Sequence, residues 1–173
     1  MTRLLPLVLA CLALTGCKRE PKTVTAVGYT FTVPASWSAE PSEQEGFRQV
    51  SFDDSDFDGT CMVQVFKVEV EPEAWVDTMA KVFKARGRTA STFKSTLGTF
   101  EGASFEGTIP SDTAMGKLAQ LAGPPHVEVY ALRREEETVG LMLTTLGDER
   151  ERRGSRAACA AVLASMKVAA PSR

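Results

Sequence analysis

Alternating apolar and polar residues run through most of this chain, and they predict a protein built mainly from β-strands. Residues 28–34 alternate aromatic or aliphatic side chains with threonine and end at Pro34, so they predict a strand with one buried face. Residues 47–53 predict a second strand, and the valine-rich residues 61–70 predict a third. The second and third strands lie close together in sequence, which favours a hairpin between them.

Four more strands are expected in the second half of the chain. Residues 92–100 and 103–109 predict two strands on either side of Gly102. Residues 127–133 and 139–146 predict a last hairpin, and the three glutamates between them are typical of a solvated turn.

Two amphipathic helices are expected in addition to the strands. The first is predicted to begin at Pro72 and to end near Gly87. Its apolar residues recur with helical spacing and form one stripe, which comprises Trp75, Val76, Met79, Val82 and Phe83. The second helix follows a capping box, Asp148-x-x-Glu151. Its predicted apolar face holds Cys159, Val162, Leu163 and Met166.

The order of these elements favours an α+β fold over a doubly wound parallel sheet. We expect one domain, an antiparallel β-sheet of about six or seven strands flanked by two main helices, arranged as a sandwich. Residues 111–125 fit this plan least well, because their apolar side chains have helical spacing but Gly116 and Gly123 weaken a helix. That segment predicts either a short lid or a solvated excursion.

The first seventeen residues have a different pattern. Arg3 supplies a positive charge, Leu4 to Leu14 form an apolar run, and small residues then lead to Cys17. This order predicts a secretory leader. A membrane-spanning helix needs about 20 apolar residues, so this run is too short. A plain secretory signal is the other alternative, but the segment offers no better cleavage site than Gly16-Cys17.

The residues Leu14-Thr15-Gly16-Cys17 resemble the lipobox of bacterial lipoproteins. The resemblance implies that residues 1–16 are a signal peptide and that Cys17 carries a lipid. Two acyl chains hold a protein stably on a membrane, so the expected location is the bacterial cell envelope. The absence of Asp after the cysteine, where Lys18 stands, favours the outer membrane. Residues 17–27 would then be the lipidated cysteine and a short tether.

Composition and charge narrow the classes of partner. The chain has 173 residues, with 20 Lys and Arg against 22 Asp and Glu. Cleavage before Cys17 would leave 157 residues, the size of one ordinary domain. The basic residues are not clustered as they are in nucleic-acid-binding proteins, so we expect no nucleic-acid partner.

Two cysteines remain in the mature domain, Cys61 and Cys159. Their spacing excludes a CxxC redox or zinc motif. In an oxidising compartment they predict a disulfide, and two buried thiols are the alternative.

Residues 54–59 begin like a calcium-binding loop, with Asp54, Asp56 and Asp58 before a glycine. Carboxylates at alternate positions can converge on one hard cation. The bidentate glutamate of a full loop is missing, because Val65 occupies its position. An acidic hairpin turn is therefore the simpler interpretation, and calcium is the one cofactor that remains possible.

Motifs for catalysis are weak in this sequence. His126 is the only histidine, and residues 102–106, which include Ser104, fail the last position of the G-x-S-x-G elbow. There is no P-loop and no dinucleotide-binding glycine pattern. We therefore expect the protein not to be an enzyme.

Three features resemble the PsbP-like fold, which includes DcrB-type bacterial lipoproteins: the opening 28–37, the helix that holds Trp75, and the closing residues 164–167. The resemblance covers residues 24–168. It implies a single α+β domain over 28–168, followed by a disordered tail at 169–173. It also implies a protein that binds or assists other proteins at a membrane. The leading expectation is a lipid-anchored interaction or assembly module in contact with an envelope protein. The alternatives are a small-ligand or calcium-binding lipoprotein and an envelope hydrolase.

Overall fold

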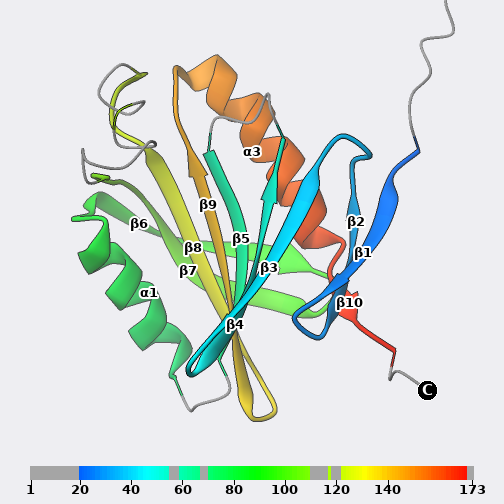
Figure 1. The fold of residues 1–173 in the computed structure, drawn as a ribbon. Helices are drawn as coiled ribbons and strands as arrows, with labels where there is room; N and C mark the ends of the chain where they lie inside the picture. The colour runs from blue at the N-terminus through cyan, green and yellow to red at the C-terminus, as the bar shows by residue number, and fades with distance from the viewer. Residues whose placement is uncertain (1–19, 55–58, 67–69, 110–116, 118–121, 171–173) are drawn as a thin grey trace, which may run out of the picture.

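The computed structural model describes residues 20–54, 59–66, 70–109, 117 and 122–170 of the chain. It contains two antiparallel β-sheets and two main helices (Figure 1). Among the described residues, no helix has the length and apolar character needed to cross a membrane. The predicted α+β class and the antiparallel sheet are confirmed.

The larger sheet has seven strands in the order β3-β4-β5-β9-β8-β7-β6. Every neighbouring pair in it is antiparallel. In this order the strands are β3 (Ser38–Gln44), β4 (Phe47–Asp53), β5 (Gly59–Phe66), β9 (Glu137–Thr145), β8 (His126–Arg134), β7 (Gly98–Glu106) and β6 (Arg86–Ser95). The two hairpins expected from the sequence, β4–β5 and β8–β9, are both present.

The smaller sheet consists of β1 (Lys22–Ala26), β2 (Tyr29–Val33) and β10 (Lys167–Val168). It corrects two predicted boundaries. The expected tether over residues 17–27 is too long, because Lys22 already pairs with Val33 across β1 and β2. The expected tail also begins too early, since the Ala169 amide donates a hydrogen bond to the Gly28 carbonyl oxygen. Both segments are held by backbone pairing, which depends little on side-chain pattern.

Helix α1 (Pro72–Val82) begins where the proline predicted, but its buried face differs from the predicted stripe. Trp75, Val76 and Ala80 are buried, whereas Val82 is 60% exposed. The helix also ends before Gly87, which lies inside β6. Lys84 takes the left-handed conformation just after the helix, at φ 49°, so the turn does not need the glycine.

Helix α3 (Glu149–Ala164) begins directly after Asp148, where the sequence predicted its start. The Asp148 side chain accepts a hydrogen bond from the backbone N–H of Arg150 at 2.8 Å. This contact satisfies one of the amides that a helix start leaves without a partner.

The predicted strand break at Gly102 is wrong. The turn between β6 and β7 lies at residues 96–97, and Gly102 sits inside β7 opposite Tyr130. A Cβ atom on Gly102 would come within 2.7 Å of the Tyr130 ring. The glycine is there because the neighbouring strand approaches closely, not because the chain turns.

The seven-stranded sheet is covered on both faces. Helix α3 and the three-stranded sheet cover one face, which we call the α3 face, and α1 covers part of the other, the α1 face (Figure 1). Strand alternation divides the side chains between the two cores. In β5, for example, Cys61, Val63 and Val65 join the core under α3, while Met62 joins the core under α1.

Candidate functional site

The two cysteines among the described residues form the predicted disulfide. Cys61 in β5 and Cys159 in α3 are bonded, with their Cα atoms 5.6 Å apart. Both side chains are fully buried. The bond therefore fastens α3 to the middle of the large sheet, and these sulfurs are structural groups.

The predicted calcium residues are only partly described. Asp54 accepts a hydrogen bond from the Ser36 hydroxyl at 2.9 Å, while Asp56 and Asp58 lie outside the described residues, as does Cys17. Over the described parts of the chain, no group of three or more His, Cys, Asp or Glu side chains could hold a metal ion. Calcium binding thus stays a prediction.

A buried polar network that the sequence did not suggest lies under α3. Glu128 in β8 is only 2% exposed. Its carboxylate accepts hydrogen bonds from the Tyr130 hydroxyl at 2.6 Å and from Nη2 of Arg156 at 2.9 Å, and Nε of Arg156 also donates to it. His126 Nε2 lies 3.6 Å from the same carboxylate.

This network shifts the ionisation of its members strongly. Burial alone would raise the pKa of Glu128, but the polar contacts from His126, Arg156 and Tyr130 outweigh burial and lower that pKa to about 2. Burial and the bond to Glu128 raise the pKa of Tyr130 to about 12. The carboxylate therefore stays charged, and it ties α3 to β8 as a structural ion pair.

The sequence held one weak signal for this network. His126, Glu128 and Tyr130 alternate along β8, so they share the face that packs under α3. A glutamate at a buried position of a strand needs a cationic partner. Arg156 supplies that charge from a helix 28 positions away, and the sequence could not name it.

The strand registers gather three turns at one end of the molecule, which we call the hairpin end. These turns are Val27–Gly28, Glu45–Gly46 and Glu135–Glu136. The start of β1 lies at the opposite end of its sheet, because Lys22 pairs with Val33 while Ala26 pairs with Tyr29 beside the turn. In Figure 1 the β8–β9 turn is at the bottom and the start of β1 is at the upper right.

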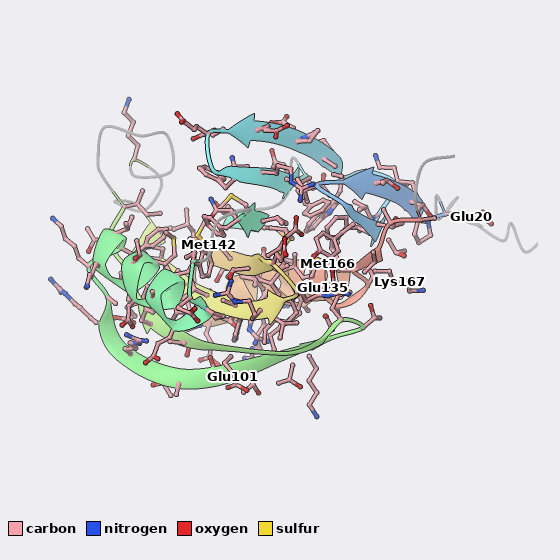
Figure 2. All side chains as sticks on the ribbon, turned by 90° about the horizontal axis from the view of Figure 1, so that it is seen from below. Glu20, Glu101, Glu135, Met142, Met166 and Lys167 are labelled. Carbon is pink, nitrogen blue, oxygen red and sulfur yellow. A yellow bond between two sulfur atoms is a disulfide. The ribbon has the colours of Figure 1, made fainter. Side chains whose placement is uncertain are left out.

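Two hollows are lined by residues of the hairpin end, and a third lies beside the start of α1. The first, which we call the Tyr29 hollow, has a volume of about 440 Å³, and its walls are Gly28, Tyr29, Arg134, Glu135, Glu136, Glu137 and Val168. A second, of about 320 Å³, lies between Gly28 and Arg48 on the other side of the same turn. A third, of about 490 Å³, lies between the start of α1 and β7, beside Glu101. Figure 2 views the molecule from below, onto this end, and labels Glu101 and Glu135.

The Tyr29 hollow is negatively charged on balance. Arg48 donates a hydrogen bond to Glu137 at 2.7 Å and holds that carboxylate against the β1–β2 turn. Burial first, and then the charge of Glu137, raises the pKa of the Tyr29 hydroxyl. The phenol therefore stays neutral beside the acidic turn, and the hollow can accept a cation or a hydrogen-bond donor.

Comparison with known proteins shows the fold alone. No protein-family model matches the sequence, and no curated protein is significantly similar to it. The solution structure of cyanobacterial PsbP from Synechocystis is similar with a TM-score of 0.53 and 12% identity. That similarity covers 94% of this chain and 99% of the cyanobacterial one. The expected PsbP-like fold is therefore confirmed.

A crystal structure from Bacteroides thetaiotaomicron is also similar, with a TM-score of 0.49 and 14% identity. The similarity covers 88% of this chain and 49% of the Bacteroides chain, so this protein spans about half the length of that one.

Proposed function

We propose that this protein is a lipid-anchored module of the bacterial cell envelope that binds another envelope protein through its hairpin end. Lipid on Cys17 would hold the chain on the membrane, with the outer membrane favoured by Lys18. The contact would be non-enzymatic.

The observation that carries this proposal is the short distance along the chain from Cys17 to β1. Lys22 is already paired in the small sheet, so a tether from Cys17 would reach at most about 18 Å. The domain would be held close to the bilayer at the end where β1 starts. Strand β1 is five residues long, so the Val27–Gly28 turn at the hairpin end would lie about 17 Å farther along the strand.

The two ends of the molecule differ, and this difference supports a contact at the hairpin end. Two of the hollows are lined by Gly28 in the β1–β2 turn at this end, whereas the start of β1 would face the anchor. The PsbP-like fold also supports the proposal, because such folds mostly bind or assist other proteins.

The anchor is tested by labelling cells with radioactive palmitate. The intact protein should incorporate label and sediment with membranes, and a Cys17→Ser variant should do neither. Incorporation of label by Cys17→Ser would contradict the anchor.

The partner is tested by photocrosslinking in living cells. A crosslinking amino acid at Glu136 should give one abundant adduct with an envelope protein, and the Cys17→Ser variant should give much less of it. A matched probe at Glu106, which is exposed at the opposite end of β7, should not give this adduct. Adducts of equal yield from both positions would contradict a specific contact at the hairpin end.

A further inference from the structure

We propose that the Tyr29 hollow is the docking site for a basic segment of the partner protein, which inserts a lysine or arginine side chain with its aliphatic stem against Val168 and its charge at Glu135 and Glu136. This inference rests on the proposed function and names the surface and the chemistry of the contact.

The wall of the Tyr29 hollow includes an apolar side chain, Val168, that is unusually exposed for this molecule. Val168 is 56% exposed, and among the described residues only one other large hydrophobic side chain, Val82, is exposed to that degree. Lys167 precedes Val168 in β10, and strand alternation turns its side chain the other way. An aliphatic stem of a long basic side chain is well suited to cover such a surface.

The charge of the hollow favours a cation. Its walls hold three glutamates and one arginine. Glu137 is neutralised by Arg48 at 2.7 Å and faces Arg134 across the β8–β9 pair. Glu135 and Glu136 are exposed at the turn, and neither is bound to any cation in the described structure. With Arg48 and Arg134 set against the three glutamates, one net negative charge remains for an incoming cation.

The hollow is built by the fold rather than by one flexible loop. Three segments that are far apart in the sequence, residues 28–29, 134–137 and 168, form its walls. The backbone hydrogen bond from Ala169 to Gly28 closes one side of it. Its volume of about 440 Å³ is within the usual range of pockets that bind small groups.

The hollow beside α1 is a weaker candidate for a cation. Its Glu71 is already paired with Arg133 at 2.8 Å. Glu73 lies in the first turn of α1, where the helix dipole accounts for a negative charge.

The test is a binding titration with the full-length lipidated protein in nanodiscs of zwitterionic lipid. The probe is a fluorescent pentapeptide that alternates leucine and arginine, and the same peptide with neutral citrulline in place of arginine measures the contribution of charge. Empty nanodiscs serve as the blank. The arginine peptide should bind about tenfold more tightly than the citrulline peptide, the effect of two weak ion pairs.

Matched variants locate the site. The double variant Glu135→Gln/Glu136→Gln should weaken binding of the arginine peptide about tenfold, and Val168→Ser should weaken it about threefold. The controls Glu40→Gln/Glu106→Gln and Val82→Ser remove the same groups at exposed positions elsewhere. Both controls should leave the affinity unchanged.

The outcomes separate this inference from the proposed function. No binding, or equal weakening by the two double variants, would overturn the basic docking site, even if the crosslinking experiment finds an envelope partner. Conversely, binding that follows the matched variants would support the docking site, even if Cys17→Ser retains its crosslinks and the anchored function fails.

Discussion

The two faces of the seven-stranded sheet are covered in different ways. The α3 face carries a helix and a second sheet, and a disulfide and a buried ion pair fasten the helix. The α1 face carries one helix, which packs chiefly on β7, β8 and β9. Trp75 of that helix lies directly against Gly140.

The difference shows two ways to bury a sheet. Helix α1 packs through apolar side chains on β7, β8 and β9, and its polar contacts, such as the 2.8 Å pair between Glu71 and Arg133, lie on exposed or half-exposed groups. Helix α3 packs on β9, which directly precedes it, but it also meets β2 and β5 from the first half of the chain, and β10 pairs with β2. On the α3 face, a covalent bond and a buried ion pair add to the apolar packing of these contacts. We therefore expect the α3 face to depend on single groups more strongly than the α1 face.

The largest effect is expected from loss of the disulfide. Cys61 and Cys159 are 98 positions apart, and a bond that closes a loop of about that length stabilises a fold by about 4 kcal/mol through chain entropy. The double variant Cys61→Ala/Cys159→Ala should lose that much free energy of unfolding, measured by urea denaturation. Adding a reductant should lower the wild-type midpoint but leave the variant unchanged. An identical midpoint for the wild type with and without reductant would show that the α3 face does not need the bond.

A smaller effect is expected from the buried ion pair, and it depends on pH. The folded pKa of Glu128 is about 2, below its ordinary value of 4.5. The ionised Glu128 carboxylate therefore stabilises the folded protein above about pH 4.5, and this contribution is lost as the pH falls toward 2. Because Arg156 is half exposed, we expect the ion pair to contribute about 2 to 3 kcal/mol to the free energy of unfolding, which is less than the full pKa shift of Glu128 would imply.

The measurement is the free energy of unfolding from pH 7 to pH 2. The Glu128→Gln variant should lose less stability than the wild type over this range, and a matched Glu106→Gln variant should behave like the wild type. Parallel curves for Glu128→Gln and the wild type would mean that the carboxylate does not hold α3.

The smallest expected effect is the difference in stability between two glycine variants, one on each face of the seven-stranded sheet. A Cβ at Gly102 would overlap the backbone of β8 at Val129 and Tyr130, whereas the three atoms nearest to a Cβ at Gly140 all belong to the Trp75 ring, the closest at 2.7 Å. A side-chain ring can shift but a paired strand cannot, so Gly102→Ala should cost about 3 kcal/mol and Gly140→Ala about 1 to 2 kcal/mol. Thermal unfolding of the two variants tests the order. A larger loss for Gly140→Ala would reverse the comparison and make the α1 face the more tightly packed one.

Much of the fold could be predicted because it follows from local patterns. Period-two alternation located β2, β4, β5, β8 and β9, and Pro72 and Asp148 marked the starts of both helices. Strand β3 was missed because its residues are mostly polar and exposed at the sheet edge. Residues 111–125 fall largely outside the described residues, so the prediction of a lid there stays open.

The candidate site could be predicted only in part. The acidic turn at 135–137 was visible in the sequence, but its simplest interpretation was a solvated turn. Its neighbours in the hollow, Tyr29 and Val168, belong to strands at opposite ends of the chain. No local pattern connects them, because their contact depends on how the small sheet packs on the large one.

The sequence by itself determined the alternation of buried and exposed side chains in the strands that it located, where the helices begin, and the resemblance of residues 14–17 to a lipobox. These properties depend on neighbours a few residues apart, whose geometry the backbone fixes. Only the tertiary structure decided that Arg156 neutralises Glu128, that Gly102 makes room for Tyr130, and that three distant segments enclose the Tyr29 hollow. Those contacts join residues that are distant in sequence, and they exist only once the sheets and helices have packed together.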